Sequence, residues 1–507
     1  MSSARGRIES FFTPSSVAVV GASPLETKVG HVIFHNLVIN RQREILKAEL
    51  FPVNPKYQTI LGIRCYPSLL KLPEDIETVV VCTPAAAVPQ IVEEAAARRC
   101  KSMIIISAGF SEVGNRQLED EVSRIGRKEG IRIVGPNCLG VYDPHSGMDT
   151  LFLPEVKLLS SGREVIATPR PLRGEVTLIT QSGAFGAAAL DYMAGHGIGV
   201  SKFVSYGNKV DVAEPELLNY FMEDEKTKVI LLYTESISDG RKFLETAQEV
   251  SMKKPIVALK VGRTRAGARA AASHTASLSG EDRIYEAAFG QCGVIRAEAM
   301  EEFFDIARAV LTQPPAAGRR VAILTDGGGP GIMAADRCEE SNLIVERFSS
   351  ETMAKFEALK KEGALPLIMT DVNPVDLTGS ATSEMYEKAL NVLLEDDRVD
   401  SIIAIVLHHV PAILDDVIEK IARSMSYHSK PITVCDIGGT EMAEEFRTRF
   451  EKYCLPSYST PERAARAIYG LTRYGDYLKR NNAFEDYLKI FTCTPKIRLN
   501  LEPGTKA

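Results

Sequence analysis

The sequence contains no tryptophan, and its nine cysteines form no Cys-x-x-Cys pair. The cysteine spacing therefore predicts neither a disulfide framework nor a zinc site. Acidic residues outnumber basic ones, and the net charge of −6 leaves no basic surface for nucleic acid or an anionic membrane. No apolar run reaches the roughly 20 residues that cross a bilayer, and residues 1–16 lack the apolar core of a signal peptide. We expect a cytoplasmic protein with no nucleic-acid or membrane partner.

The chain has 507 residues, of which 45% are hydrophobic and 25% charged, as in soluble globular proteins. This length predicts about three domains of roughly 150 residues each. From Ser16 onward, short apolar runs alternate with longer amphipathic stretches, which is typical of parallel sheets covered by helices. In the first unit, residues 10–150, the apolar runs are 17–20, 77–82, 101–107 and 131–134, with a helix over 88–99. We expect a Rossmann-like domain here.

The rest of the chain contains two similar units. A segment rich in Ser, Pro and Arg, 156–174, predicts a linker; units at 175–312 and 319–480 follow, and 482–507 is a tail. Four motifs recur in the same order in both units, each near the start or end of a predicted strand. These pairs are 176–183 with 321–328, 208–211 with 373–376, 223–224 with 396–397, and 254–256 with 430–432. The predicted fold class is therefore α/β, with a Rossmann-like domain followed by two tandem flavodoxin-like domains.

The first domain has glycine and polar residues after its predicted strands, where parallel sheets bind ligands. Gly21 and Ser23 follow the first strand, and a glycine turn before a helix suits a phosphate. The second strand ends in Asn54-Pro55-Lys56, whereas a dinucleotide site needs a carboxylate there for the ribose hydroxyls. A lysine favours a ligand with an extra phosphate, such as coenzyme A or NADP, over NAD. The later strands end near Thr83-Pro84, Gly109 and Asn137.

The second domain combines an anion site with a carboxylate and a histidine. Ser182 is placed as the N-cap of a helix that opens with Gly183 and Ala184, an arrangement that binds anions. Glu235 follows an apolar strand at the same sheet edge. His274 lies in a segment of small residues, 262–280, that we expect to be a mobile loop. A surface loop with an incidental histidine would explain His274 alone; the three features together suit a phosphohistidine whose tautomer the carboxylate holds.

Taken in order, these motifs resemble the alpha subunit of nucleoside-diphosphate-forming acyl-CoA synthetases, a family related to succinyl-CoA synthetase. The resemblance covers residues 11–477. It implies that His274 is phosphorylated, that Glu235 hydrogen-bonds it, and that Ser182, Gly183 and Ala184 hold phosphate. It also implies that Asn137 lies where the thioester meets phosphate. The residues in the family's coenzyme A loops are Gly21, Ser23, Asn54, Lys56, Thr83, Pro84 and Gly109.

The resemblance implies a ligase that catalyses acyl-CoA + ADP + Pi = acid + CoA + ATP, through an acyl phosphate and a phosphohistidine. The family binds ADP or ATP and Mg²⁺ on an ATP-grasp domain, for which the 482–507 tail is too short. We therefore expect a separate ATP-grasp beta subunit and a heterotetramer. Acetate is the family's default among small organic acids, and branched or aromatic acids are the alternatives.

Two other functions compete with this interpretation. A non-catalytic, coenzyme A-binding regulatory protein of the same fold would not need His274, Glu235 and Ser182 together. An NAD(P)-dependent oxidoreductase is disfavoured by Lys56 and by the tandem pair of flavodoxin-like domains. We predict no metal site: the pair His408-His409 has no carboxylate or cysteine spacing beside it, and we assign the third domain a structural or docking role.

Overall fold

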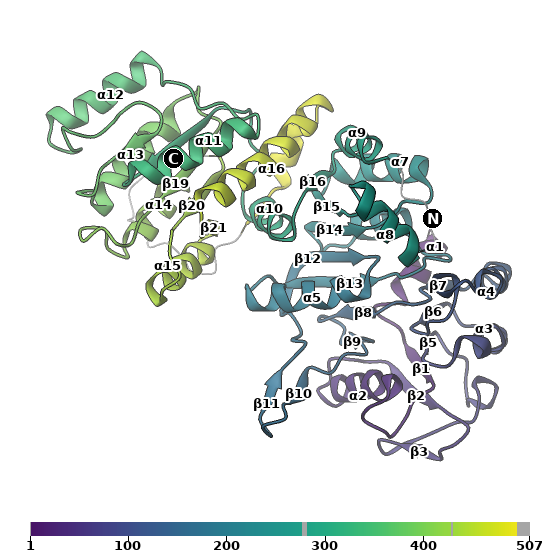
Figure 1. Cartoon of the computed structure of the whole chain (residues 1–507). Helices are drawn as coiled ribbons and strands as arrows, with labels where there is room; N and C mark the ends of the chain where they lie inside the picture. Colours follow the sequence, from purple (N-terminus) through teal and green to yellow (C-terminus); the bar gives the residue numbers. More distant parts are fainter. Residues whose placement is uncertain (1, 276–280, 427–428, 494–507) are drawn as a thin grey trace. The chain divides into compact units, whose positions relative to one another are not determined.

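The computed structural model describes residues 2–275, 281–426 and 429–493 (Figure 1). The chain divides into two compact units, Met1–Cys292 and Gly293–Ala507, which we describe in turn. Within the described ranges, no helix combines the length and the apolar character needed to cross a membrane.

The first unit begins with a five-stranded parallel sheet in the order β2-β1-β5-β6-β7. All five residues of β1 are buried, as expected for a strand covered on both faces. The strands are β1 (Ser16–Val20), β2 (Glu49–Val53), β5 (Thr78–Val81), β6 (Ser102–Ile105) and β7 (Arg132–Val134); a small hairpin, β3 (Thr59–Ile60) and β4 (Ile63–Arg64), follows β2. This sheet confirms the predicted Rossmann-like topology.

Helices follow the strands of this sheet. They are α2 (Val29–Gln42), α3 (Val88–Ala97) and α4 (Arg116–Glu129), with α1 (Ser2–Glu9) before β1 and short 3₁₀ turns η1 (Leu69–Lys71), η2 (Ala85–Ala87) and η3 (Ser111–Val113). Apolar residues of α3 and α4, such as Val92 and Ile125, join those of β5 and β6, such as Val79 and Met103, in one buried cluster. This core holds the carboxyl ends of the strands at one edge.

A second sheet in the same unit contains the strand order β15-β14-β12-β13-β8-β9. Its parallel strands are β12 (Arg173–Thr180), β13 (Val200–Ser205), β14 (Val229–Thr234) and β15 (Ile256–Lys260). Two further strands, β8 (Gly140–Asp143) and β9 (Met148–Asp149), precede them in the chain, and β8 pairs antiparallel with β13. The end of the segment assigned to the first domain therefore belongs to the second sheet, because its backbone groups hydrogen-bond there.

The segment interpreted as a linker also has regular structure. Strands β10 (Val156–Leu158) and β11 (Glu164–Ile166) form an antiparallel hairpin, and β12 begins at Arg173. The hairpin exposes most of its side chains, which is why its sequence shows no buried face.

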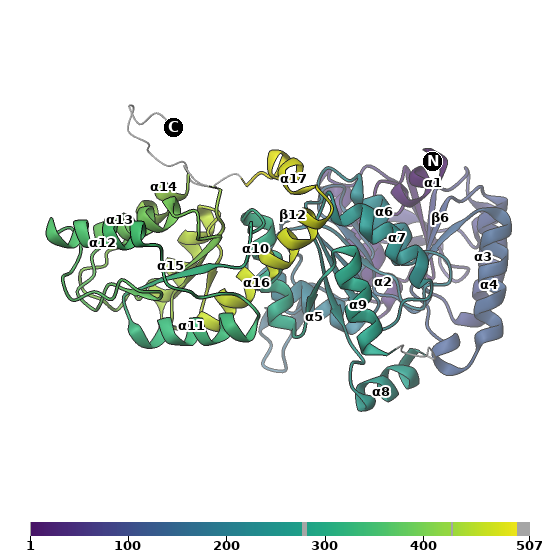
Figure 2. The same cartoon turned by 90° about the horizontal axis from the view of Figure 1, so that it is seen from above.

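Five helices accompany the second sheet: α5 (Gly183–Gly195), α6 (Glu214–Met222), α7 (Gly240–Ser251), α8 (Arg265–Thr275) and α9 (Asp282–Cys292). The segment around His274 is predicted as a mobile loop, but its residues 265–275 form α8. The many alanines and arginines of this stretch favour helix, a propensity that outweighs the lack of an apolar stripe. Helix α8 lies near η3 of the first sheet (Figure 2).

The second unit contains a five-stranded parallel sheet in the order β18-β17-β19-β20-β21. The strands are β17 (Val321–Thr325), β18 (Val375–Asp376), β19 (Ser401–Ile405), β20 (Ile432–Cys435) and β21 (Ser457–Tyr458), with β16 (Ile295–Ala297) at the start of the unit. The helices are α10 (Met300–Thr312), α11 (Gly328–Glu340), α12 (Ser350–Lys361), α13 (Ser383–Glu395), α14 (Val417–Met425), α15 (Glu441–Lys452), α16 (Pro461–Arg480) and α17 (Phe484–Ile490).

The two flavodoxin-like sheets share one connectivity. In each, the first strand (β12 or β17) pairs with the second and third strands, and the fourth strand pairs with the third. The internal repeat found in the sequence is thus a repeat of fold, with α5 and α11 at equivalent places.

One pair of cysteines differs from the prediction made from the sequence. Cys454 and Cys493 form a disulfide with their Cα atoms 6.4 Å apart, whereas the sequence spacing predicts none. The pair is 39 residues apart in the chain and is brought together only by the fold around α16 and α17. Within the described residues, the other cysteines form no disulfide.

Candidate active site

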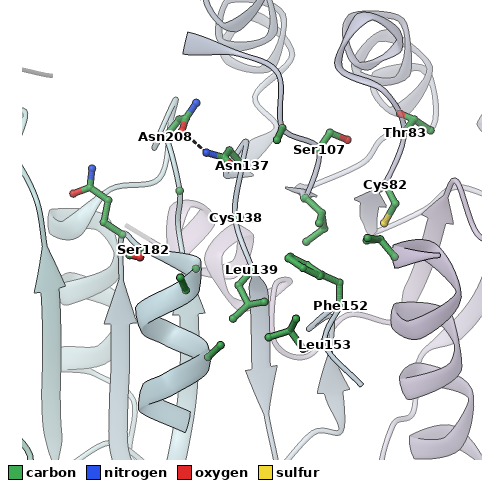
Figure 3. Close-up of a pocket in the computed structure, with 18 of the residues that line it drawn as sticks. Cys82, Thr83, Ser107, Asn137, Cys138, Leu139, Phe152, Leu153, Ser182 and Asn208 are labelled. Atoms are coloured by element: carbon green, nitrogen blue, oxygen red, sulfur yellow. Dashed lines mark hydrogen bonds between the residues drawn. The ribbon is translucent and has the colours of Figure 1, made fainter. Parts of the chain in front are cut away.

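A cleft of about 790 Å³ lies in the first unit, at the carboxyl edges of its two sheets (Figure 3). Pockets of this size at strand ends are the usual ligand sites of doubly wound folds. Its lining residues come from the segments that follow β5, β6, β7, β9, β12, β13 and β14 and from the starts of α2 and α5. They are Val29, Cys82, Thr83, Ile106, Ser107, Ala108, Asn137, Cys138, Leu139, Phe152, Leu153, Gln181, Ser182, Gly183, Ala184, Ala187, Gly207, Asn208 and Glu235.

The N-terminus of α5 opens into this cleft. Ser182 is the N-cap: its Oγ accepts the N–H of Phe185 at 3.2 Å, and its C=O accepts the Thr180 hydroxyl at 2.9 Å. The N–H groups of the first helical residues, Gly183 and Ala184, have no place in the helix's own hydrogen-bond ladder. These N–H groups form the positive end of the helix dipole, which suits an anion such as phosphate.

Among the described residues that line the cleft, Glu235 is the one with a charged side chain. Glu235 directly follows β14. Its backbone N–H donates to Gln181 Oε1 at 2.9 Å, and the N–H of Ser236 donates to the same oxygen at 3.2 Å. Glu235 is only 7% exposed. Burial and the Glu235 charge raise the pKa of neighbouring Tyr233 to about 12. The backbone of Glu235 is therefore tied to the residue that precedes Ser182.

The first sheet contributes polar groups from the opposite side of the cleft. Thr83 follows β5, and among the described residues nothing hydrogen-bonds to its buried hydroxyl. Such a group needs a partner, so a polar ligand atom fits here. Burial raises the pKa of the Cys82 thiol far above its usual range and that of Cys138 to about 12. Both thiols are neutral at pH 7 and are not nucleophiles.

Asn208 links the two sides of the cleft. Its amide donates to Glu112 Oε2 at 2.7 Å and to Glu119 Oε2 at 2.8 Å, and its own oxygen accepts the Asn137 amide at 3.4 Å. The residue before it, Gly207, has φ +52°, and a Cβ there would collide with the carbonyl oxygen of Pro136. The approach of the two sheets thus requires glycine at 207.

The Glu112 carboxylate accepts hydrogen bonds from backbone N–H groups in the loop after β6. It accepts the N–H of Gly109 at 2.6 Å and that of Phe110 at 3.2 Å. Burial opposes ionisation of Glu112, but the hydrogen bonds from Gly109 and the Asn208 amide outweigh it and lower the pKa of this carboxyl. The Gly109 N–H is therefore already engaged by the protein.

The structure brings together some of the predicted site residues and leaves others outside the cleft lining. Thr83, Asn137, Ser182, Gly183, Ala184 and Glu235 line the cleft, whereas Gly21, Ser23, Asn54, Lys56, Pro84 and Gly109 do not.

The residues outside the lining shape the turn after β1. A Cβ on Gly30 would collide with the Gly21 carbonyl, so α2 packs directly on this turn. Asn54 donates to the Ala22 carbonyl at 2.8 Å and accepts the N–H of Lys56 at 3.0 Å. Lys56 is exposed, where its charge is available to a ligand.

His274 lies in the last turn of α8, and its side chain is outside the described residues. The predicted pair of His274 with Glu235 therefore stays a prediction.

Several lining residues have no counterpart in the sequence prediction. Gln181 and Asn208 both lie in motifs that recur between the two flavodoxin-like domains, and this recurrence could have identified them. Phe152 and Leu153 follow β9 and give no local signal, because nothing in an apolar pair indicates that it lines a cleft rather than a core.

The second unit contains a histidine–carboxylate pair. His408 Nδ1 lies 2.7 Å from Asp436 Oδ1, and its ring stacks on His409 with centroids 3.9 Å apart. Across the residues with described positions, no cluster of three or more His, Cys, Asp or Glu could hold a metal ion.

Comparison with known proteins agrees with this architecture. Three family models match the chain: a CoA binding domain over residues 15–144, a succinyl-CoA ligase like flavodoxin domain over 173–310, and a ligase-CoA domain over 321–475. Fold and family models together define a protein built from a coenzyme A-binding domain and two ligase-type flavodoxin-like domains.

Relatives narrow this class. The acetate–CoA ligase [ADP-forming] I subunit alpha of Pyrococcus furiosus is 38% identical, covering 93% of this chain and 98% of its own. Acetate–CoA ligase [ADP-forming] I of Archaeoglobus fulgidus is 38% identical over 94% of this chain. The chain belongs to the ADP-forming acetate–CoA ligase family. It spans 65% of the length of the Archaeoglobus relative and 64% of a second, from Methanocaldococcus jannaschii.

A solved structure of the same kind matches the whole fold. The acetyl-coenzyme A synthetase 1 of Ca. Korarchaeum cryptofilum, determined with phosphate and ADP, has a TM-score of 0.82 and 32% identity, and the match covers 96% of this chain and 99% of that one.

Proposed function

We propose that this chain is the alpha subunit of an ADP-forming acid–CoA ligase, which catalyses acyl-CoA + ADP + Pi = acid + CoA + ATP. The single observation that carries the proposal is the cleft itself. It joins the edge of the coenzyme A-binding domain to the N-terminus of α5, with Glu235 beside it. Family membership supports the same reaction.

The first step is attack of phosphate on the thioester. Phosphate binds the N–H groups of Gly183 and Ala184 and the Ser182 turn. One phosphate oxygen forms a bond to the thioester carbonyl carbon, the C–S bond breaks, and the coenzyme A thiolate leaves and takes up a proton. Thr83 and Asn137, on the opposite side of the cleft, hydrogen-bond the thioester end of coenzyme A, and the exposed Lys56 binds a phosphate of its nucleotide.

The second step moves the phosphoryl group to His274. An unprotonated imidazole nitrogen bonds to phosphorus while the bond between phosphorus and the acyl oxygen breaks, and the carboxylate product leaves. Glu235 accepts a hydrogen bond from the other ring nitrogen and so positions the imidazole.

The third step needs a partner. ADP and Mg²⁺ bind an ATP-grasp beta subunit, the phosphohistidine transfers its phosphoryl group to ADP, and the two chains form a heterotetramer. The subunit naming of the Pyrococcus relatives supports separate chains.

A labelling experiment tests this function. The chain and its ATP-grasp partner are incubated with γ-labelled ATP and Mg²⁺. Acid-labile, base-stable label on this chain is expected, and His274→Ala should abolish it. The matched control is His196→Ala, because His196 is an exposed histidine whose ring Nδ1 faces the Tyr192 carbonyl at 2.9 Å, outside the cleft lining. No label on the wild-type chain in the presence of the partner would contradict the proposal and favour a non-catalytic coenzyme A-binding protein.

A further inference from the structure

A buried ion pair adjoins the loop that carries Glu235. Lys209 Nζ lies 2.9 Å from Glu214 Oε1, and the two side chains are only 7% and 1% exposed. Neither residue is among those that line the cleft. Asn208, the residue before Lys209, does line it and accepts a hydrogen bond from the Asn137 amide (Figure 3). Because buried charges lower stability unless they are paired and hydrogen-bonded, the other contacts of this pair indicate what it does.

The Glu214 carboxylate has three donors around one oxygen. Besides the Lys209 ammonium, Oε1 accepts the Tyr206 hydroxyl at 3.0 Å, and the Thr234 hydroxyl lies 3.2 Å away. Burial and the charge of Glu214 raise the pKa of Tyr206 well above its ordinary value, so the phenol stays protonated and remains a donor. Hydrogen bonds to a charged acceptor are stronger than neutral ones. The carboxylate is therefore fixed at the start of α6, next to the last residue of β14.

The same ion pair contacts the backbone on the other side of Glu235. Lys209 Nζ donates to the carbonyl of Ser236, the residue that follows Glu235. The hydroxyl of Thr234, the residue before Glu235, lies 3.0 Å from the same carbonyl. Gln181 Oε1 accepts the two N–H groups of this segment. The position of the Glu235 backbone therefore depends on the ion pair as well as on Gln181.

The backbone conformation of Lys209 supports a role for its side chain. Lys209 has φ +51°, in the left-handed region that glycine and asparagine enter at less cost than lysine. Residues in this region persist where surrounding contacts offset the cost, and they cluster at functional sites. The Lys209 ammonium also lies 5.8 Å from the centroid of the Tyr206 ring. In the third domain, where the motif 208–211 recurs as 373–376, Pro374 stands at this position and supplies no ammonium.

We propose that the Lys209–Glu214 ion pair positions Glu235 for phosphoryl transfer. It holds the backbone on both sides of Glu235, so that the carboxylate used in the proposed mechanism keeps one orientation. The inference rests on the proposed ligase function and adds two positioning residues outside the cleft lining. A misplacement of about 1 Å can slow an enzyme on the order of 10²-fold. Because Gln181 still holds the loop when the ion pair is lost, we expect a smaller effect, about tenfold.

The test removes both charges at once, because loss of Lys209 alone would leave a buried carboxylate without its partner. Lys209→Met/Glu214→Gln leaves an amide oxygen for the two hydroxyls but removes the donor to the Ser236 carbonyl. The variant is phosphorylated with γ-labelled ATP, Mg²⁺ and the ATP-grasp partner. Nucleotide is then removed, and decay of the phosphohistidine after addition of ADP is followed by rapid quench. The rate constant at saturating ADP should fall about tenfold, while the half-saturating ADP concentration should change less than threefold.

A double-mutant cycle separates positioning from a general loss of stability. The same two changes are introduced into Glu235→Ala, which has no carboxylate to position. If the ion pair acts through Glu235, the changes should slow decay less than threefold further in this background. A tenfold loss in both backgrounds would overturn the inference, because the ion pair would then act independently of the carboxylate.

A buried ion pair of the second unit provides the matched control. Lys360 Nζ lies 2.7 Å from Asp371 Oδ2, and the side chains are 11% and 22% exposed. Lys360→Met/Asp371→Asn should change phosphohistidine decay less than threefold. Thr234→Val, in which both charges of the Lys209–Glu214 pair remain, is the alternative if the first variant does not fold, and it should slow decay about threefold. Thermal unfolding by circular dichroism checks the folding of each variant.

Three results have distinct meanings. Decay at the wild-type rate in folded Lys209→Met/Glu214→Gln, or in Thr234→Val if that variant does not fold, would remove the ion pair from the mechanism. Equal slowing by the control pair would also overturn the inference, since lost stability would then explain the kinetics. A wild-type chain that forms no phosphohistidine would instead contradict the proposed ligase function.

Discussion

The second and third domains repeat one fold but differ at several residues that follow equivalent strands. In the second domain, β12 ends in Gln181 and Ser182, and the Ser182 side chain caps α5. In the third, β17 is followed by Asp326 and Gly327, and α11 has no side-chain cap. Both helices begin at the carboxyl edge of a parallel sheet. The fold therefore places a helix N-terminus at a sheet edge twice, and the neighbouring side chains make the two places different.

The two domains also differ in the residues that follow the third strand of each repeat. Glu235 follows β14 and is held by Gln181 through its backbone. The equivalent position after β19 is Leu407, whose N–H donates to Asp326, the counterpart of Gln181. The next residue, His408, lies 2.7 Å from Asp436 of its own domain. Helix α8, with His274, follows β15, whereas β20 is followed by a glycine turn and α15. We infer that the second domain carries out phosphoryl transfer and that the third has diverged from it.

The largest expected effect comes from Glu235→Gln. Glutamine keeps the shape of the side chain but loses its charge, so the imidazole is less well oriented and phosphoryl transfer to ADP should slow on the order of 10²-fold. Rapid-quench measurement of phosphohistidine decay in the presence of ADP reads this step directly.

His408→Gln, one residue beyond the position equivalent to Glu235 in the third domain, is the comparison for this prediction. It should slow the same step by less than about threefold. An equal loss of phosphoryl-transfer rate in both variants would show that both domains take part in this step. It would contradict the inference that the second domain carries it out and the third has diverged.

Removal of the cap at Ser182 should have a smaller effect. Ser182→Ala loses the hydrogen bond to the Phe185 N–H and should lower the free energy of unfolding by about 1 kcal/mol. It should also raise the KM for phosphate several-fold, since the first turn of α5 is less well ordered. Denaturant titration and steady-state kinetics measure the two quantities.

Thr382 provides the matched control, because its side chain caps α13 by accepting the Met385 N–H outside the cleft. Thr382→Ala should cost similar stability without any change in the KM for phosphate. A phosphate effect of the same size in both variants would mean that lost stability, rather than the α5 turn, explains the kinetics.

The smallest effect concerns Asp326, the counterpart of Gln181. Burial raises the pKa of Asp326 to about 7, and the N–H of Leu407 donates to its carboxyl oxygens at 3.2 and 3.3 Å. Because the native state keeps this proton longer than the unfolded state does, stability should fall as the pH rises from about 4 to about 7. Asp326→Asn, which mimics the protonated acid, should remove that slope.

Thermal unfolding of the full chain between pH 5 and pH 8 measures this prediction. The Asp326→Asn variant should unfold several degrees higher than the wild type at pH 8 and nearly equally at pH 5. A variant that melts lower at both values would show that Asp326 is ionised and needed in the native state.

The sequence alone determined the order and class of the domains. Hydrophobic periodicity, glycine turns after buried strands and the internal repeat are local signals, and they predicted three doubly wound sheets and the turn at Ser182. They also placed Glu235 at a strand end, because the carboxyl ends of parallel strands meet at one edge.

Only the tertiary structure decided which residues meet. The antiparallel addition of β8 and β9 to the second sheet moves Leu139, Phe152 and Leu153 into the cleft, and no local pattern predicts a pairing across some sixty residues. The same holds for the contact of Asn208 with Glu112 and for the disulfide between Cys454 and Cys493. Long-range contacts depend on how whole elements pack, so the residues that complete the cleft cannot be derived from neighbours in the chain.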